Sequence, residues 1–449
     1  MTADTTWQTE FDAWLAPFLA QLRRSEQRRW APLYVWGLLG PGERKSVEPI
    51  AGRVAPGEVQ QLHHFVSGSP WSIAPLEAVL AAKADELVGG PNAVLVVDDT
   101  GLPKQGKHSV GVARQYCGQL GKRANCQVLV SLTLAQGEVP VPVGLRLYLP
   151  EVWCSDPERR RRASVPEDLG HRPKWRIALD DIDRLLAAGV RFGCVVADAG
   201  YGACAAFRRG LVERGLTFAV GVLATQKVYP RDVTLAAPVR RSTGRPPKHA
   251  IPSTASVPVQ DLFADQDAPA FEPVVWRVGS KGPLTAEFAA LRVRGADGPA
   301  NRHAQHLPGD EAWLVCEKRA DDKRKYYLCN HPADAALADL AAAIKARWVC
   351  EQAHQQLKQE LGLGHYEGRG WIGLHHHLVL AQIAFAFLQH LRLRGKKPSR
   401  SSRRRWSATP TDAAASTVSS HRRTHARPPA LPLLPAVLRP SPAPVSAPR

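Results

Sequence analysis

Two short apolar runs, each ending in an aspartate, constrain the fold of this chain more than any other feature. Residues 93–98 read AVLVVD, and residues 194–198 read CVVAD. A continuous run of β-branched and other apolar residues is typical of a strand that is buried on both faces. The two runs therefore predict a sheet covered by helices, with an acidic side chain at the end of two of its strands.

The patterns around these runs alternate between strands and helices. They predict strands at 127–134, 141–149 and 217–222, and helices at 177–186 and 205–214. Gln136-Gly137 is a plausible hairpin turn between the first two of these strands. The order of three strands, helix, strand, helix, strand predicts the first part of an α/β core over residues 91–222.

The segments before and after this core differ from it in composition and pattern. They predict that the chain is divided into several regions. Residues 1–90 show apolar side chains at helical spacing, among them Phe11, Trp14, Leu15 and Phe18, with arginines close by. Either a helical DNA-binding domain or a packing module with a solvated basic face fits this pattern. Residues 223–333 predict a β-rich insertion, including a basic, proline-rich loop at 241–249, and residues 334–395 predict helices that complete the core.

The formal charge of the 449 residues is +18, with 59 Lys and Arg against 41 Asp and Glu. Such a charge predicts attraction to polyanions, meaning nucleic acid or an anionic membrane surface. Residues 396–449 hold 11 basic residues, one acid and 10 of the 37 prolines, which gives 11 − 1 = +10 and leaves +8 elsewhere. We interpret this segment as a disordered basic tail, because it is too poor in apolar residues to form a core.

Several classes of protein are disfavoured by the same composition. The apolar stretch 378–388 is shorter than the roughly 20 residues that span a bilayer, and the first residues do not resemble a signal peptide. The eight cysteines include no C-x-x-C pair, so we expect free thiols in a reducing compartment. A cytoplasmic protein without membrane partners is expected.

A candidate third acid lies in the predicted helix 334–361. Ile344, Arg347, Glu351, His354 and Lys358 are spaced 3, 4, 3 and 4 residues apart, which places them on one face of a continuous helix. A solvated Arg347–Glu351 pair is the alternative interpretation. The three consecutive histidines at 375–377 are interpreted as surface or DNA-proximal residues.

Three sequence blocks resemble the DDE transposases of bacterial insertion sequences, within the RNase H-like transposase and integrase superfamily. They are DDTGLPKQGKHSVGVARQYCGQLGKRANCQV at 98–128, VVADAGYG at 195–202 and ARWVCEQAHQQLKQELGLGHYEGRGWIG at 346–373. The family carries a Tyr-x2-Arg-x3-Glu-x6-Lys signature, which Arg347, Glu351 and Lys358 match and in which Ile344 replaces the tyrosine. The resemblance extends over about residues 10–393.

The resemblance implies an RNase H-like mixed-sheet core and a catalytic triad of Asp99, Asp198 and Glu351. These acids would bind two Mg²⁺ ions, with Mn²⁺ as a substitute, for phosphoryl transfer on DNA. Asp99 is preferred to Asp98 because the family's acid usually precedes the threonine directly, and alternation points the two side chains to opposite faces. The expected DNA contacts are Arg347, Lys358, Lys104, Lys107, Arg114 and Lys122.

The implied function is a nucleoid-associated transposase that binds terminal inverted repeats as a homodimer, cleaves the ends and joins 3′-hydroxyls to target DNA. A catalytically inactive or domesticated DNA-binding protein derived from a transposase is one alternative. A different RNase H-like nuclease is another, although the spacing of Arg347, Glu351 and Lys358 argues against it.

Overall fold

The computed structural model describes residues 3–236, 250–264, 269–279, 282–299, 306–319, 321 and 323–395. The basic loop predicted at 241–249 and the basic tail predicted at 396–449 lie outside these residues.

Five strands form the centre of a large mixed sheet, in the spatial order β4-β3-β1-β5-β6. Their bounds are β1 Gly90–Pro103, β3 Lys122–Gln136, β4 Val139–Leu147, β5 Phe192–Ala197 and β6 Phe218–Val222. The first three strands pair antiparallel, whereas β5 pairs parallel with β1 and β6 pairs parallel with β5. This is the RNase H-like order, which confirms the predicted α/β fold class.

Helices cover both faces of this sheet, as the uninterrupted apolar runs predicted. Leu95 and Val97 of β1 belong to the main hydrophobic core, which also contains Ile182 of α8 (Lys174–Ala187) and Leu211 of α10 (Ala205–Glu213). Val96 points to the opposite face, where it packs with Val349 and Cys350 of α12 (Trp348–Gln359). Alternation along β1 therefore sends successive side chains toward two different sets of helices.

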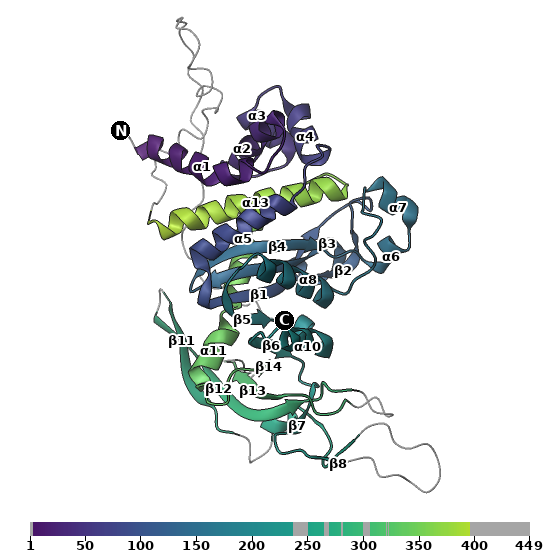
Figure 1. Ribbon diagram of the computed structural model, residues 1–449, viewed down its shortest axis with the longest axis vertical. Helices are drawn as coiled ribbons and strands as arrows, with labels where there is room; N and C mark the ends of the chain where they lie inside the picture. Colours follow the sequence, from purple (N-terminus) through teal and green to yellow (C-terminus); the bar gives the residue numbers. More distant parts are fainter. Residues whose placement is uncertain are drawn as a thin grey trace, which may run out of the picture.

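The β-rich insertion extends the same sheet instead of forming a separate one. Its strands are β7 Lys227–Pro230, β10 Val257–Pro258, β11 Glu272–Gly279, β12 Gly282–Gly295, β13 Glu311–Lys318 and β14 Arg324–Cys329. Strand β14 pairs antiparallel with β6, and β13, β12 and β7 follow outward (Figure 1). Two further strands, β8 (Leu235–Ala236) and β9 (Ile251–Pro252), pair only with each other. The insertion is thus anchored to the core beside the strand that follows Asp198.

One long helix lies between most of the N-terminal helices and the sheet (Figure 1). The N-terminal helices are α1 Ala3–Leu19, α2 Ser25–Leu39, α3 Val47–Val54, α4 Val59–Ser67 and α5 Ala74–Val88. Figure 1 shows α13 (Trp371–Leu393) lying between α1 to α4 and the sheet, whereas α5 lies beside α13 on the side of strand β4. Apolar side chains of α1 to α5, α13 and the sheet belong to one continuous hydrophobic cluster, so these helices share the core of the sheet.

Helix α13 is long and apolar enough to span a membrane by length and composition, with a mean hydropathy of 1.4 over its most apolar window. However, 83% of that window is buried inside the protein. Its composition therefore fits a central core helix, packed on one side by α2 and α4 and on the other by α5 and the sheet (Figure 1).

Three elements between β1 and α8 were not predicted from the sequence. Strand β2 (Ala113–Cys117) forms a hairpin with the start of β3, and short helices α6 (Glu151–Cys154) and α7 (Pro157–Arg162) follow β4. Asp156 caps α7 by accepting a hydrogen bond from the backbone N–H of Arg159 at 2.9 Å. These elements lie at the same end of the molecule in Figure 1.

Candidate active site

Strand β1 separates the two adjacent aspartates at its centre. Asp98 follows Val96 on the face covered by α12, and its Oδ2 accepts a hydrogen bond from Nη1 of Arg347 at 2.7 Å. Asp99 points to the other face, where Lys174 of α8 and Tyr201 bind its carboxylate. Only Asp98 therefore faces the helix that carries Glu351, and the structure does not bring Asp99 to that helix.

Asp198 reaches the same edge of the sheet as these two aspartates. The parallel register pairs Val97 of β1 with Ala197 of β5, so the residues that follow on the two strands are neighbours. Asp198 also caps the short helix α9 (Ala199–Gly202), because its Oδ1 accepts a hydrogen bond from the N–H of Gly200 at 2.9 Å. This bond uses one carboxylate oxygen of Asp198 to hold the turn that follows β5.

Crowding and burial change the acidity of the two β1 aspartates. Burial raises the pKa of Asp98 to about 7, although Arg347 opposes the shift, and the charge of Asp198 raises it further. Burial also raises the pKa of Asp99, which Lys174 and Tyr201 oppose and Asp198 reinforces. The charge of Asp198 acts on both groups, so the three carboxyl groups lie within electrostatic reach of one another.

Arg347 connects this edge to the predicted third acid. Its Nη1 binds Asp98, and its Nη2 binds Oε1 of Glu351, whose side chain is 59% exposed. Burial lowers the pKa of Arg347, but Asp98, Glu351 and Asp198 together more than offset that effect and raise it. One guanidinium is therefore within electrostatic reach of Asp98, Asp198 and Glu351.

The helix predicted over 334–361 is two helices, which corrects the expectation of one continuous face. Helix α11 (Leu337–Lys345) ends just before Arg347, and α12 begins just after it. The N–H groups of Val349 and Cys350 bond to carbonyls three residues earlier, which marks a tight turn at the junction. Ile344 is buried in the core against β5, whereas Arg347 starts the segment that faces Asp98.

The donor set fits hard divalent cations. Asp98, Asp198 and Glu351 offer carboxylate oxygens, the ligands that Mg²⁺ and Mn²⁺ prefer. Asp98 is buried, and its ionised carboxylate is stabilised by the positive charge of the Arg347 guanidinium. A cation bound by these carboxylates would supply the same compensation.

Comparison with known proteins agrees with this geometry. A family model described as DDE superfamily endonuclease matches residues 17–283, more than half of the chain. The chain belongs to the DDE superfamily of endonucleases. The matched segment contains Asp98, Asp99 and Asp198, whereas Arg347 and Glu351 lie beyond it.

A probable transposase for insertion sequence element IS701 from Microchaete diplosiphon is 29% identical over 226 residues, which cover 50% of this chain and 56% of that relative. This chain thus matches little more than half the length of that protein. A cryo-EM structure of a piggyBac transposase synaptic complex with hairpin DNA aligns with a TM-score of 0.42 and 10% identity, over 89% of this chain and 76% of the other. The fold assignment for this DDE endonuclease rests on its own strand order.

Lys174 and Tyr201 are site residues that sequence reasoning missed. The Tyr201 hydroxyl donates to Oδ1 of Asp99 at 2.5 Å, and the Lys174 ammonium binds Oδ2. Tyr201 lies inside the VVADAGYG block, three residues after Asp198. This proximity to a candidate acid is the sequence feature that could have indicated its place in the site. Lys174 begins α8, and nothing in its local sequence connects it to Asp99.

The predicted basic DNA contacts of this DDE endonuclease fall into two groups. Lys358 is partly buried on α12, where burial lowers the pKa of its ammonium and Cys117 and Asp98 oppose the effect. Lys107, Arg114 and Lys122 are exposed near the β2–β3 hairpin. Lys104 differs from these, because its Nζ donates to the carbonyl of Tyr366 at 2.6 Å and braces the loop after α12.

The histidines at 375–377 are buried, which corrects their interpretation as surface residues. His376 lies 2.8 Å from the carbonyl oxygens of both Val66 and Trp71 and stacks on the Trp71 ring. His377 accepts the Tyr34 hydroxyl at Nδ1 over 2.9 Å, with its Nε2 oriented to the Leu363 carbonyl. His376 and His377 join α13 to the N-terminal region, whereas His375 bonds to the carbonyl of Trp371 within α13.

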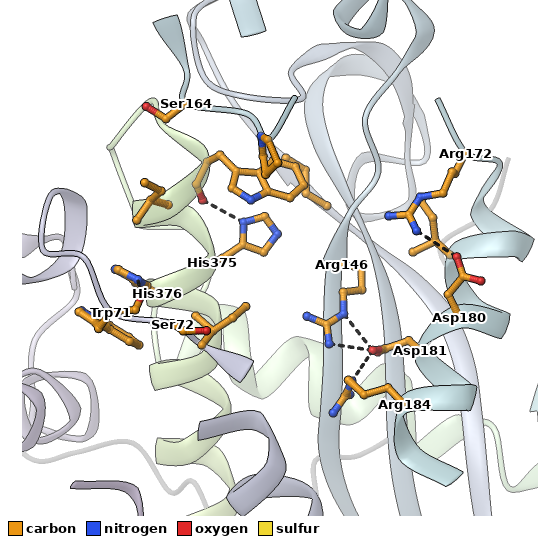
Figure 2. A pocket seen from close by; sticks show the side chains of 16 residues that line it. Trp71, Ser72, Arg146, Ser164, Arg172, Asp180, Asp181, Arg184, His375 and His376 are labelled. Atoms are coloured by element: carbon orange, nitrogen blue, oxygen red, sulfur yellow. Dashed lines mark hydrogen bonds and ion pairs between the residues drawn. The ribbon is translucent and has the colours of Figure 1, made fainter. Parts of the chain in front are cut away.

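A separate pocket of about 580 Å³ lies between α8, α13 and β4 (Figure 2). Its wall contains a buried ion cluster in which Arg146 of β4 binds Asp181 of α8, together with Arg184. Arg146 also makes two bonds to Glu77 of α5, at 2.6 and 3.0 Å. Asp98, Asp198 and Glu351 do not line this pocket. The ion cluster in its wall instead joins β4, α5 and α8.

Proposed function

We propose that this protein is a transposase that cleaves DNA at the ends of an insertion sequence and joins the freed 3′-hydroxyls to target DNA. The observation that carries the proposal is the convergence of Asp98, Asp198 and Glu351 on Arg347 within an RNase H-like sheet. The named relative is itself described as a probable transposase, which supports the choice of reaction.

We assign metal binding to Asp98, Asp198 and Glu351. This differs from the family-based preference for Asp99, because Asp99 faces Lys174 and Tyr201 on the opposite side of β1. Two bound Mg²⁺ or Mn²⁺ ions would supply an activated oxygen nucleophile and stabilise the leaving oxygen. Asp99 then acts as a positioning residue that fixes β1 against α8 and α9.

Arg347 and Lys358 hold the DNA backbone in this proposal. Both lie within electrostatic reach of Asp98, so both would place positive charge beside a phosphate bound there. If these carboxylates held metal ions, the Arg347 guanidinium would be able to bind a phosphate oxygen in place of its carboxylate partners. Lys107, Arg114 and Lys122 contact the duplex further along, and these contacts are sequence-independent.

The proposed partners are the terminal inverted repeats of the element, target DNA and a second copy of this chain, since two ends must be cut. We also propose a cytoplasmic, nucleoid-associated location. The proposed partners and the proposed location are those that the assigned reaction requires.

The experiment uses the purified full chain, labelled DNA carrying the element ends, unlabelled target plasmid and Mg²⁺. Cleavage at the ends and joined products are expected for the wild type and are expected to disappear in Asp198→Asn and Glu351→Gln. DNA binding measured by gel shift should persist in both variants. A wild-type protein that binds the ends but never cuts or joins them would replace the transposase by a DNA-binding protein without catalysis.

A further inference from the structure

A buried cluster beside Asp98 has no role in the proposed reaction. Cys350 and His354 are four residues apart on α12, so both side chains leave the same face of the helix. His354 Nε2 lies 2.7 Å from Oγ of Ser131, and Cys350 Sγ lies 3.4 Å from Oγ1 of Thr133. These contacts seat the thiol and the imidazole against β3.

The β1–β3 register places Asp98 directly beside this pair. Asp98 is the partner of Ser131 across the two strands, so its carboxylate projects from the sheet next to His354. One ligand atom from each of Asp98, Cys350 and His354 lies within 4.8 Å of the other two, and all three residues are buried.

The spacing of these atoms matches tetrahedral coordination. Zinc bonds of about 2.3 Å to sulfur and about 2.0 Å to nitrogen place those two ligands roughly 3.5 Å apart at a tetrahedral angle. The distance from Cys350 Sγ to His354 Nε2 is 3.5 Å. The thiol and imidazole are therefore already separated as two zinc ligands would be.

We propose that Asp98, Cys350 and His354 form a binding site for a borderline-soft divalent cation of the Zn²⁺ class, which inhibits the enzyme by withdrawing Asp98 from the Mg²⁺ site. Thiolate and imidazole ligands favour Zn²⁺, whereas Mg²⁺ prefers oxygen ligands. The coordination stands without the proposed function. The inhibition rests on it, because it requires Asp98 to serve the catalytic metals.

Binding has a defined chemical balance. The Cys350 thiol releases its proton to solvent and bonds as the thiolate, and neutral His354 bonds through Nε2 in place of its contact with Ser131. Asp98 exchanges the Arg347 guanidinium for the metal, and a water molecule completes four ligands. The alternative is a hydrogen-bonded core network in which these side chains bind no metal.

Cobalt(II) is the probe for coordination, because tetrahedral Co²⁺ with a thiolate ligand has characteristic charge-transfer and visible absorption. The full-length wild type is expected to bind one equivalent with this spectrum, and Zn²⁺ should displace it. Cys350→Ser should lose the thiolate absorption, and His354→Gln should weaken binding by at least about tenfold. Cys126→Ser is the matched control, since Cys126 is another buried free thiol, whose sulfur lies 3.8 Å from the carbonyl oxygen of Gln115.

Each outcome decides the proposal. A thiolate spectrum that disappears in Cys350→Ser but remains in Cys126→Ser supports the site. No thiolate absorption in the wild type, or an unchanged spectrum in Cys350→Ser, overturns it. Circular dichroism establishes that each variant is folded, and His354→Gln decides the matter if Cys350→Ser does not fold.

The competition is measured by titrating Zn²⁺ into strand joining at fixed Mg²⁺. Zn²⁺ should inhibit the wild type and Cys126→Ser, and Cys350→Ser should need at least about tenfold more Zn²⁺. Equal Zn²⁺ sensitivity in Cys350→Ser and the wild type contradicts inhibition through this site. If cobalt binds as expected but no preparation joins DNA in Mg²⁺, the proposed function fails while the metal site stands.

Discussion

Nη1 of Arg347 lies 2.7 Å from Oδ2 of Asp98, a residue 249 positions earlier in the chain. The contact joins the centre of β1 to the residue just before α12, and the same guanidinium binds Glu351. Positive charge therefore occupies the position between two proposed metal ligands.

Replacing Arg347 by alanine is expected to destabilise the metal-free protein at pH 8 by about 2 kcal/mol, because Asp98 loses its cationic partner while it stays buried. Saturating Mg²⁺ should restore much of this loss, since the metal supplies the missing charge. Urea unfolding with and without Mg²⁺ measures both effects. Arg176→Ala, which removes an exposed pair with Asp180, is the control and should change little. An Arg347→Ala variant as stable as the wild type without metal would contradict this role.

Removing the Tyr201 hydroxyl tests the positioning role of Asp99. Tyr201→Phe keeps the ring that packs near Phe207 but leaves Asp99 without one of its two donors. The free energy of unfolding should fall by about 1–3 kcal/mol, while strand joining should remain detectable. Tyr116→Phe, at a side chain that is 64% exposed, serves as the control for stability. Complete loss of joining in a folded Tyr201→Phe variant would place Tyr201 and Asp99 in the reaction itself.

Arg146 neutralises two buried carboxylates, Glu77 and Asp181, whose side chains are 6% and 3% exposed. Arg146→Met keeps the length of the side chain but leaves both acids without this partner. We expect a loss of about 3–5 kcal/mol in the free energy of unfolding. Arg176→Met at the exposed pair with Asp180 should stay within about 0.5 kcal/mol of the wild type. Urea midpoints for both variants test the difference, and equal midpoints would show that the cluster adds no stability.

Buried histidines predict a loss of stability in acid. Burial lowers the pKa of His377 to about 4 and that of His375 to about 4. A lowered pKa means that the unfolded chain binds the proton more tightly, so the stabilisation is complete above pH 6.5 and is lost as the pH falls toward 4. Each histidine should cost roughly 1.5 kcal/mol between pH 6.5 and pH 5.

The variant His377→Gln isolates one of these contributions. It should be less stable than the wild type at pH 7.5, because the contacts with Tyr34 and Leu363 change, but it should lose less stability on going to pH 5. His108→Gln, at an exposed position, should retain the full wild-type loss. Unfolding midpoints at the two pH values give the slopes, and an unaltered slope in His377→Gln would exclude this residue as a source.

The strands and the acidic edge could be predicted because their signals are local. The runs that end at Asp98 and Asp198 become β1 and β5, and the strands predicted in the insertion appear as β11 to β14. The choice between Asp98 and Asp99 could not be made locally, because it depends on which face of β1 receives α12. Alternation shows only that their side chains diverge.

The remaining differences between prediction and structure arise from contacts with residues that are distant in the sequence. The break before α12 has neither proline nor glycine to announce it, and it lies where Arg347 turns toward Asp98. His376 is a polar residue that was predicted at the surface, but in the structure it contacts two backbone carbonyl oxygens inside the core. Lys104, predicted as a DNA contact, also donates a hydrogen bond to the Tyr366 carbonyl, and its role on DNA stays a prediction. Each partner lies far away in the chain, so spacing could not reveal it.

The central claim is that Asp98, and not Asp99, joins Asp198 and Glu351 in holding the catalytic metals. Strand joining by Asp98→Asn and Asp99→Asn, compared at equal protein and saturating Mg²⁺ with gel shifts to establish equal DNA binding, tests it most directly. The structure predicts that Asp98→Asn abolishes joining while Asp99→Asn retains measurable activity. Loss of joining in Asp99→Asn with activity retained in Asp98→Asn would contradict the claim.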